Sequence, residues 1–550
     1  MLARTRGRAK LVHPFSQVAQ NAPGYALDAV YELGSTTRGE RAKPRLMLPR
    51  LLAGLLALAA CSSPHTSAPP EAPADASATA DLTYPRLATY FIESHVDEAA
   101  LDVMAKSDVV IVDAEAGALD RATLEELRAR RPDLLLLAYL TSEEISREPA
   151  DERPLADERF ERVPDHAWML EPGSTLAAPV SATDTTLRVT DPSAFTLRRP
   201  HSDFYGEDEP TYLFVNGEHM RLVAIDGDRL TVERGFRSTP VAHPAGTKVA
   251  SHVVFFAGTW MLNIAANAPT VDGRAWRDEL AAEAAELVAD GPWNGVFLDV
   301  CFSDVSWLNG GLLDLDRDGR ADDRSTVSTE WSAGMGMLVD TLRARLGPDV
   351  PIVSNPGAQD CPHPSLDGIL MEGWPIGMPP HYLAYDTGED RYRDWSSRGT
   401  KLTIANGFSP RIGFGTIQEG QDEVARTDYQ AMRFGLASAL MGDGVYAYDN
   451  GVFGHYVAWW YDEYDGAGRG RRWLGRALGP AREHGALRWR EFEHGLAVVN
   501  VGDTPTSFAA PPGFEKLAGR QDPTHNDGRP VTGPLRIGAK DAYLLVRSAN

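Results

Sequence analysis

The chain has 550 residues, 43% of them hydrophobic, and a formal net charge of −23 from 54 Lys and Arg against 77 Asp and Glu. This length is too great for one small domain and suits a large domain with smaller modules attached. The acidic balance argues against a nucleic-acid partner and against electrostatic docking on anionic lipid. A neutral or cationic substrate fits it better.

The N-terminal region has the features of a bacterial lipoprotein leader. A short apolar run at 48–60 follows basic residues and ends in Leu58-Ala59-Ala60-Cys61, which resembles a lipobox. Such a box is cut before the cysteine, which then carries the lipid. We therefore expect an N-terminal extension and signal peptide over 1–61, with residues 1–46 either an over-extended gene start or a real cytoplasmic extension. The expected location is extracytoplasmic, anchored at Cys61 to the outer membrane or cell surface of a bacterium.

Residues 62–83 are rich in Pro, Ala and Ser and have little to bury, which predicts a flexible linker. From 84 to 475, short β-branched runs alternate with helical patterns. This is the rhythm of an α/β fold with a parallel sheet, and we predict a (β/α)8 TIM barrel. There are nine candidate strands for eight places, one of them surplus, and either of the last two suits closure: 87–91, 109–114, 134–140, 260–265, 295–300, 351–355, 368–374, 401–406 and 444–449.

Two further segments have an all-β pattern. Residues 174–252 alternate polar and apolar side chains between turn residues, which predicts an all-β insertion with a hairpin at Asp226-Gly227-Asp228. The insertion falls between the third and fourth candidate strands, where a structural lid is favoured over a separate sugar-binding site. Residues 476–550 alternate in the same way and predict a C-terminal antiparallel β-sandwich.

Several candidate barrel strands end on polar residues, and this end of a parallel barrel carries the active site. A lone strand-end acid is often a helix cap. Asp299 and Glu372 lie in two strands of one ring, however, and two carboxylates that face one cavity are the minimum equipment for glycoside hydrolysis. We expect these two to be catalytic. The polar residues expected to bind substrate are Asp113, Glu144, Asn263, Asp304 and Asn355.

Aromatic residues near the same strand ends suit a sugar substrate, because their rings stack on the apolar faces of pyranoses. The aromatic residues expected to bind substrate are Tyr90, Tyr139, Trp260, Trp307 and Trp374. Ordinary core aromatics are the alternative. Trp374 is the strongest case in sequence, because it follows Glu372 closely.

The stretch "DLDRDGRAD" at 314–322 resembles an EF-hand calcium loop, with acidic oxygens at positions 1, 3, 5 and 9 and glycine at position 6. Ser325 stands at position 12 in place of the usual Glu, although Asp323 is nearby. A structural calcium ion is expected here, and a solvated acidic turn is the alternative. The predicted set is Asp314, Asp316, Asp318, Arg320 and Asp322; catalysis is expected to need no cofactor.

Cys301 and Cys361 each closely follow a candidate barrel strand. In an oxidising compartment they can form a disulfide between neighbouring loops, and two buried thiols are the alternative.

The motifs "LATYF", "VVIVDA", "LLLLAYLTSEE", "WNGVFLDVCFSD" and "GILMEGW" together resemble the TIM-barrel proteins of hypothetical glycosyl hydrolase family 15. They are more distantly similar to the endo-α-1,4-polygalactosaminidases of glycoside hydrolase family 114. The resemblance implies a catalytic Asp at the end of a "GVFLD" strand and a Glu on a later strand, which are Asp299 and Glu372 here. "AYLTSEE" takes the place of the "YLSxGE" motif but lacks its glycine, which weakens the case for Glu144.

Together these features predict a lipid-anchored glycoside hydrolase that cleaves a polysaccharide or cell-envelope glycan. Glu372 is expected to donate the proton and Asp299 to act as nucleophile or base, although the roles are exchangeable. The alternative is a non-catalytic glycan-binding lipoprotein on the same scaffold. We expect a monomer whose partner is a polysaccharide or oligosaccharide and whose only membrane contact is the lipid anchor.

Overall fold

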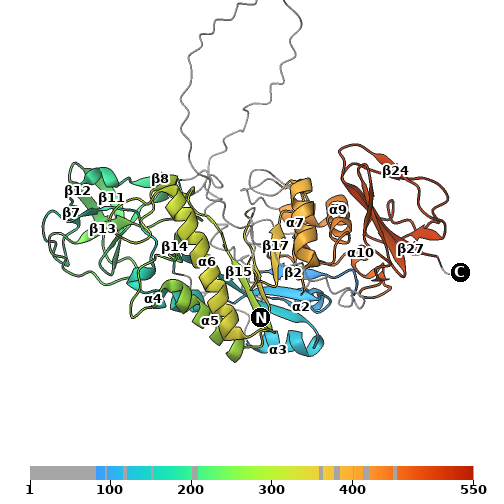
Figure 1. Cartoon of the computed structure of the whole chain (residues 1–550), viewed down its shortest axis with the longest axis horizontal. Coiled ribbons are helices and arrows are strands. Elements are labelled where there is room, and N and C mark those ends of the chain that lie inside the picture. Colours follow the sequence, from blue (N-terminus) through green and yellow to red (C-terminus); the bar gives the residue numbers. More distant parts are fainter. Residues whose placement is uncertain are drawn as a thin grey trace, which may run out of the picture.

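The computed structural model describes residues 82–92, 96–114, 121–149, 154–200, 208–357, 359, 363–376, 384–399, 402–412, 420–449 and 455–548. Figure 1 shows three parts along the longest axis. A barrel occupies the middle, a β module inserted in the barrel lies at one end, and the C-terminal β module lies at the other. Cys61 and the segment 62–81 lie outside the described residues, so the predicted leader stays a prediction.

The central sheet has eight parallel strands in the order β19-β18-β17-β16-β15-β4-β3-β2. A parallel bridge between Leu87 and Tyr446 joins the first strand to the last, and the Tyr446 N–H donates to the carbonyl oxygen of Arg86 at 3.0 Å. The predicted TIM barrel is therefore confirmed. The strands are β2 (Ala88–Phe91), β3 (Val109–Asp113), β4 (Leu135–Thr141), β15 (Gly295–Asp299), β16 (Ile352–Ser354), β17 (Gly368–Glu372), β18 (Ile404–Phe408) and β19 (Val445–Asp449).

The surplus candidate strand is 260–265, which we had placed fourth in the barrel. Its first residues form β14 (Thr259–Met261), which pairs antiparallel with β5 (Glu144–Ser146) outside the barrel. Strand β15 is consequently the fourth barrel strand and β17 the sixth. The apolar run 260–265 was misleading because it is buried between the barrel and the inserted module. A segment that is buried on both sides has the same continuous apolar sequence as a barrel strand.

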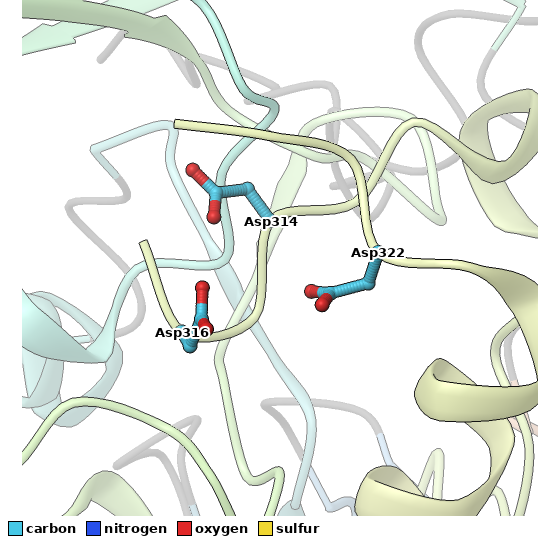
Figure 2. Close-up of side chains that lie close together, drawn as sticks. All are labelled: Asp314, Asp316 and Asp322. Carbon is cyan, nitrogen blue, oxygen red and sulfur yellow. The ribbon is translucent and has the colours of Figure 1, made fainter. Parts of the chain in front are cut away.

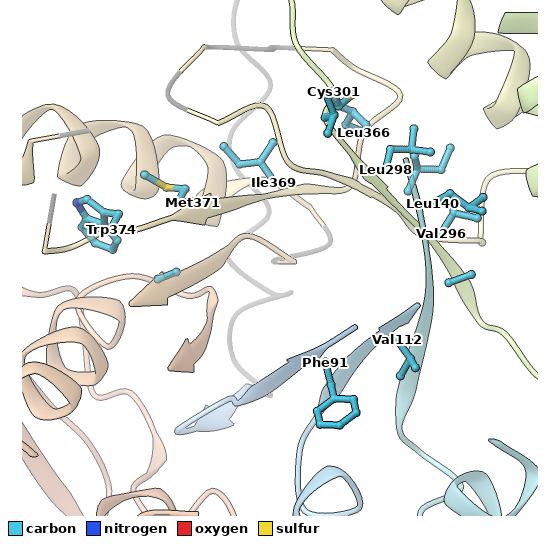
Figure 3. Close-up of a cluster of buried hydrophobic side chains, with 14 of the residues drawn as sticks. Phe91, Val112, Leu140, Val296, Leu298, Cys301, Leu366, Ile369, Met371 and Trp374 are labelled. Atoms are coloured by element: carbon cyan, nitrogen blue, oxygen red, sulfur yellow. The ribbon is translucent and has the colours of Figure 1, made fainter. Parts of the chain in front are cut away.

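Alternation along the strands sorts the apolar side chains into two layers. Side chains of one parity fill the barrel interior, including Ile111, Leu137, Phe297, Leu370 and Ile404. Side chains of the other parity point outward to the helices. Figure 3 shows this outer layer, with these residues labelled: Phe91, Val112, Leu140, Val296, Leu298, Cys301, Leu366, Ile369, Met371 and Trp374.

Helices cover the outer layer through apolar faces. In α5 the residues Trp276, Leu280 and Ala284 are buried, and their spacing of four residues places them on one face of the helix. Asp323 caps the N-terminus of α6 by accepting from the N–H groups of Ser325 and Thr326. The hydrogen bond from the Ser325 hydroxyl, together with those from Thr326, lowers the pKa of Asp323 to about 2. The helices are α2 (Glu98–Met104), α3 (Arg121–Arg130), α4 (Pro154–Arg162), α5 (Trp276–Asp290), α6 (Arg324–Leu346), α7 (Tyr385–Ser397), α8 (Gln421–Arg426), α9 (Tyr429–Ala439) and α10 (Asp462–Asp465).

The inserted module is a six-stranded antiparallel sheet, in the order β6-β13-β10-β11-β12-β7, with its own apolar core. The predicted hairpin is present, since Asp226 pairs with Arg229 across a turn in which Gly227 has a φ of +56°. The strands are β6 (Ser174–Thr175), β7 (Thr186–Arg188), β10 (Tyr212–Val215), β11 (Glu218–Asp226), β12 (Arg229–Glu233) and β13 (Lys248–Ser251), with a separate pair β8 (Arg198–Pro200) and β9 (Asp208–Pro210).

The C-terminal module is antiparallel β, with a five-stranded sheet in the order β21-β22-β23-β27-β25 and a two-stranded sheet that share one apolar core. Arg433 of α9 ties it to the barrel, because its guanidinium lies 2.6 Å from Asp522 and 3.3 Å from Asp541. The strands are β21 (Arg482–His484), β22 (Leu487–Glu491), β23 (Gly495–Asn500), β24 (Thr506–Phe508), β25 (Phe514–Lys516), β26 (Leu535–Ile537) and β27 (Asp541–Arg547); β1 (Thr83–Tyr84) pairs with β20 (Gly475–Arg476).

Among the described residues, none of the helices is both long enough and apolar enough to cross a membrane.

The packing of α6 can be tested with two glycines of that helix. A Cβ at Gly334 would lie 1.9 Å from the carbonyl oxygen of Ile264, whereas at Gly336 it would meet only the ring of His363 at 3.3 Å. We predict that Gly334→Ala lowers the free energy of unfolding by about 1–3 kcal/mol or more, because the main chain must move. The control Gly336→Ala should change it by about 1 kcal/mol at most. Urea denaturation measures both, and equal effects would contradict the packing.

Candidate active site

Polar side chains form the last inward-facing layer of the barrel. Continuing the inward parity by one step beyond the apolar residues gives a polar residue in most strands. Because parallel strands all end on the same face, these side chains line the barrel's C-terminal mouth. They are Asp113, Thr141, Asp299, Asn355, Glu372, Asn406 and Asp449.

Asp299 and Glu372 meet at the amide group of Asn355. The Asn355 Nδ2 atom donates to Asp299 Oδ1 at 2.9 Å and to Glu372 Oε2 at 3.1 Å. These two carboxylate oxygens are therefore no farther apart than the sum of the two distances, 6.0 Å. The Gly357 N–H donates to Asn355 Oδ1 at 3.1 Å, which turns the amide nitrogen toward the carboxylates. The structure thus brings together the two residues that the sequence paired.

The backbone after Asp299 is strained. Val300 has a φ of +47°, in the left-handed region that β-branched residues rarely adopt and that costs roughly 1–3 kcal/mol. Ser142 holds this turn, since its N–H donates to the Asp299 carbonyl oxygen at 2.9 Å and its hydroxyl lies 2.7 Å from the Val300 carbonyl oxygen. The turn ends the strand at Asp299 and fixes where its side chain projects.

Burial raises the pKa of both carboxyl groups. For Asp299, hydrogen bonds from Tyr139 Oη, at 2.7 Å, and from Asn355 partly offset this rise. For Glu372, the charge of His455 and the Asn355 amide lower the pKa, whereas the charges of Asp299 and Asp449 raise it further. Both hydrogen bonds to Asp299 favour its ionised form.

His455 is a site residue that sequence reasoning missed. Its Nδ1 atom makes a short hydrogen bond with Asp449 Oδ2, and its ring stacks on Tyr90 with centroids 3.9 Å apart. No strand, helix or motif in the sequence marks position 455. The position of Asp449 at the end of a candidate strand was the only available signal for this pair.

Asn406 was also missed, although it ends the candidate strand 401–406. It pairs in register with Glu372, is 1% exposed, and neither atom of its amide group has a hydrogen-bond partner among the described residues. A buried amide in this state carries a desolvation cost of about 1–3 kcal/mol. It leaves one unused donor and one unused acceptor in the polar layer beside Glu372.

The structure sorts the other predicted polar and aromatic residues. Tyr90, Tyr139, Asp113 and Asn355 belong to the inward rows that surround the pair. Asp304 lies in the loop after β15 and accepts from the N–H and hydroxyl of Ser306, so that its carboxylate closes a turn. This favours Asp299 over Asp304 as the partner of Glu372.

Trp307 is 39% exposed and extends from the same loop. It lies in edge-on contact with Phe255 and Phe302, at centroid distances of 5.8 and 6.4 Å. Phe255 follows the inserted module in the chain, so the segment after the module and the β15 loop together support this exposed ring. Its predicted role in binding a sugar stays a prediction.

Trp374 and Trp260 do not lie at the barrel mouth, contrary to our expectation. Trp374 is 1% exposed and packs on Tyr392 in the outer layer, with centroids 4.8 Å apart (Figure 3). Trp260 is fully buried and stacks on His252 at 3.8 Å under the inserted sheet. Trp374 lies two positions after Glu372, so alternation would place it on the same inward side. It lies beyond the end of β17, however, where alternation no longer holds.

Asn263 and Glu144 are also absent from the mouth. The Asn263 amide donates to the carbonyl oxygen of Leu315 at 2.7 Å, which anchors the acidic loop. Glu144 is buried in β5 and accepts from the hydroxyl of Thr259 at 2.7 Å. The error for Asn263 follows from treating 260–265 as a barrel strand. Glu144 was predicted from its place after the third candidate strand, but it belongs to β5, which pairs with β14 outside the barrel.

Three acidic side chains of the 314–322 loop gather as the sequence predicted. Ligand oxygens of Asp314, Asp316 and Asp322 lie within 4.8 Å of one another, and Figure 2 shows them around one turn of the loop. Asp314 is fully buried; its Oδ2 accepts from Lys248 at 2.6 Å, while its Oδ1 has no hydrogen-bond partner among the described residues.

Other members of the predicted ligand set behave differently. Asp318 is exposed and accepts from the Arg320 N–H at 2.8 Å, outside the three-carboxylate group. Asp323, considered near position 12, caps α6 instead.

Cys301 is buried, with its Sγ atom 3.2 Å from Met335 Sδ. Cys361 lies outside the described residues, so the predicted disulfide stays a prediction.

Part of the chain matches a known protein family. Residues 246–496 match the model of hypothetical glycosyl hydrolase family 15. The resemblance to this family is thereby confirmed over that part of the chain, which contains Asp299, Asn355, Glu372 and His455. The more distant resemblance to polygalactosaminidases stays a prediction. A search of curated proteins gives no match.

Solved structures that are similar to this chain include three enzymes with 8–10% sequence identity to it. The isomaltulose synthase of Klebsiella sp. LX3 has 10% identity and a TM-score of 0.40, over 85% of this chain and 99% of that one. The isomaltulose synthase of Erwinia rhapontici NX5 has 8% identity and a TM-score of 0.42, over 86% and 99%. The trehalulose synthase of Pseudomonas mesoacidophila MX-45 has 10% identity and a TM-score of 0.41, over 86% and 99%. These scores support no more than a general likeness.

The raised pKa of Asp299 predicts a pH-dependent cost to stability. A carboxyl group whose pKa is higher in the folded than in the unfolded state stabilises the fold below its unfolded value, here 3.8, and this contribution is lost as the pH rises through the folded value. Asp299→Asn should therefore raise the melting temperature at pH 7, and the gain should shrink toward pH 4. Asp304→Asn, which changes a surface turn, is the control and should show no gain. A gain for Asp299→Asn that is the same at both pH values would contradict the burial of a charge.

Proposed function

We propose that the protein is a retaining glycoside hydrolase in which Asp299 is the nucleophile and Glu372 the acid and base. The observation that carries the proposal is the Asn355 amide, which holds one oxygen of Asp299 within 6.0 Å of one oxygen of Glu372. Retaining enzymes place their carboxyl groups about 5–5.5 Å apart, while inverting enzymes need about 6.5–9.5 Å to admit a water molecule. The family matched by residues 246–496 supports the same chemistry.

The hydrogen bonds support this division of roles. Asp299 accepts from Tyr139 and Asn355, and both bonds favour its ionised form. Glu372 accepts from Asn355; burial and the charges of Asp299 and Asp449 favour its protonated form and outweigh the opposing charge of His455. Two neighbouring carboxyl groups that differ in this way suit a nucleophile and a proton donor.

In this mechanism Glu372 donates its proton to the glycosidic oxygen while Asp299 attacks the anomeric carbon. The leaving sugar departs as an alcohol, and Asp299 holds the remaining sugar as an ester. Glu372 then takes a proton from water, the water oxygen attacks the anomeric carbon, and Asp299 is released as a carboxylate. The unused donor and acceptor of Asn406 are suited to a polar ligand in this layer.

The setting of this enzyme is part of the proposal. We propose that it acts outside the cytoplasm as a lipoprotein anchored at Cys61, as a monomer, on a polysaccharide or cell-envelope glycan. Leu58-Ala59-Ala60-Cys61, which resembles a lipobox, supports the lipid anchor. We also propose that the two C-terminal sheets form a sandwich, which their shared apolar core supports.

Calcium at the 314–322 loop is a further part of the proposal. The ion would be held by Asp314, Asp316 and Asp322, and the buried, unpartnered Asp314 Oδ1 supports it, since carboxylate oxygens are the ligands that Ca²⁺ prefers. Asp314 pairs with Leu170 across an isolated bridge and contacts Lys248 of β13. A bound ion would therefore stiffen the junction between the inserted module and the β15 loop and take no part in the chemistry.

Activity tests the proposed function directly. A panel of polysaccharides, assayed for new reducing ends, should identify one that the protein cleaves. On that substrate Asp299→Asn and Glu372→Gln should each lower kcat by about 10²-fold to 10⁴-fold. Asp304→Asn, in the same loop as Asp299 but outside the pair, should retain most of the activity. Glycan binding without turnover in the unaltered protein would support the binding-protein alternative, and full activity in both variants would refute the assignment.

Calcium binding is tested without substrate. Ca²⁺ should raise the melting temperature of the chelator-treated protein by an amount equivalent to about 2.7 kcal/mol at a hundredfold excess over Kd. Asp314→Asn should abolish this shift and the sensitised luminescence of Tb³⁺. The matched control Asp318→Asn should keep both, because Asp318 lies outside the carboxylate group. Equal behaviour of the two variants, or no shift in the unaltered protein, would contradict the site.

A further inference from the structure

We propose that His455, fixed by Asp449, is a positioning residue whose positive charge keeps Asp299 ionised and stabilises Glu372 when that residue gives up its proton. This inference rests on the proposed function, because it assigns a role within the same two-carboxylate reaction. Nothing in the family match or in the sequence motifs marks either residue of the pair.

The position of His455 follows from three contacts. Asp449 is the inward-facing end of β19, and its Oδ2 holds the Nδ1–H of the imidazole in a short hydrogen bond. Tyr90 stacks on the ring at 3.9 Å with an interplanar angle of 28°. The Ile92 N–H donates to the His455 carbonyl oxygen at 3.0 Å, which ties the residue's main chain to the end of β2. The ring is thus held from two adjacent barrel strands.

The same aromatic wall connects His455 to the nucleophile. Tyr90 lies between the imidazole and Tyr139, with a distance of 6.2 Å between the two tyrosine centroids. Tyr139 in turn donates to Asp299 Oδ2 at 2.7 Å. One continuous set of packed groups therefore runs from Asp449 to Asp299 across the barrel mouth.

The backbone of His455 is strained, as is that of Val300 beside Asp299. Its φ of +46° lies in the left-handed region, which is uncommon outside glycine. Such conformations persist where surrounding contacts over-determine them, and they cluster at functional sites. The contacts that hold His455 are the three given above.

The charged groups around His455 come from three strands. Asp449 of β19, Glu372 of β17 and Asp299 of β15 all act on it, and Tyr90 of β2 covers one face of the ring. Burial alone would lower the pKa of the imidazole, but the three carboxylates more than offset this and raise it to about 8. His455 is therefore mostly an imidazolium at neutral pH, and its charge in turn lowers the pKa of Asp299 and Glu372.

In the reaction, His455 keeps its proton throughout. When Glu372 protonates the leaving oxygen it becomes an anion within a group that already contains Asp449, and Asp299 becomes a neutral ester. The imidazolium offsets the new charge on Glu372. In the second step Glu372 recovers a proton from water, Asp299 regains its charge, and the same imidazolium stabilises the carboxylate that leaves.

The test compares the pH profile of kcat/KM in three proteins. His455→Gln removes the positive charge, so the pKa of Asp299 should rise and the acid limb should move to higher pH by about one unit or more. Asp449→Asn should move the limb less than His455→Gln does, because it removes a neighbouring negative charge at the same time as it weakens the imidazolium. His525→Gln is the control, since His525 is a buried histidine stacked on Tyr543 in the C-terminal module, and its profile should match that of the unaltered protein.

A lower kcat with an unmoved acid limb in His455→Gln would mean that His455 is only structural, and would overturn the inference. Full activity of Asp299→Asn and Glu372→Gln would instead refute the proposed function. Titration of the unaltered protein by ¹⁵N NMR gives an answer that needs neither a substrate nor a folded variant. The His455 ring should titrate with a midpoint near 8. A midpoint at or below the ordinary 6.5 would overturn the inference.

Discussion

One amide group between two carboxylates is the contact on which the site depends. Two anions that close together in a partly desolvated barrel mouth cannot both stay ionised without a large cost, so one of the two tends to hold a proton. The Asn355 amide donates to both groups, and Tyr139 also donates to Asp299. These contacts are the basis for the proposed roles of Asp299 as nucleophile and Glu372 as proton donor.

The rest of the fold keeps this contact in place. The parallel ladder between β15 and β16 continues to Asn355, whose N–H donates to the Leu298 carbonyl oxygen at 2.8 Å. Ser142, from the neighbouring strand end, secures the strained turn at Val300. The apolar residues of the barrel interior exclude water from below, so that the polar layer opens only toward the mouth. The strained backbone and the buried charges both lower the stability of the fold, and both lie where chemistry is expected.

Sequence alone was sufficient to predict the barrel and to predict that Asp299 and Glu372 lie together, because strand alternation and strand-end chemistry are local properties. Their catalytic role stays a prediction. It could not show which of nine apolar runs lay outside the barrel, since a buried segment such as 260–265 reads like a barrel strand. The prediction that Trp374 lies at the barrel mouth was wrong, because closeness in sequence to Glu372 does not fix where a side chain points once the strand has ended. His455 could not be found, because its place depends on the path of a loop and on Asp449 across the mouth. Asn406 and Asp449 could have been predicted, because each is the last residue of a candidate strand. They were not, because nine candidates for eight places left it open which of the last two strands closes the barrel.

The stereochemistry of the first product tests the two-carboxylate centre most directly. Proton NMR of a freshly cleaved substrate shows the anomeric configuration before mutarotation. Asn355 holds one oxygen of Asp299 within 6.0 Å of one oxygen of Glu372, which is nearer to the spacing of retaining enzymes than to that of inverting enzymes, so we predict that the configuration is retained. A product that is released with inverted configuration would contradict it.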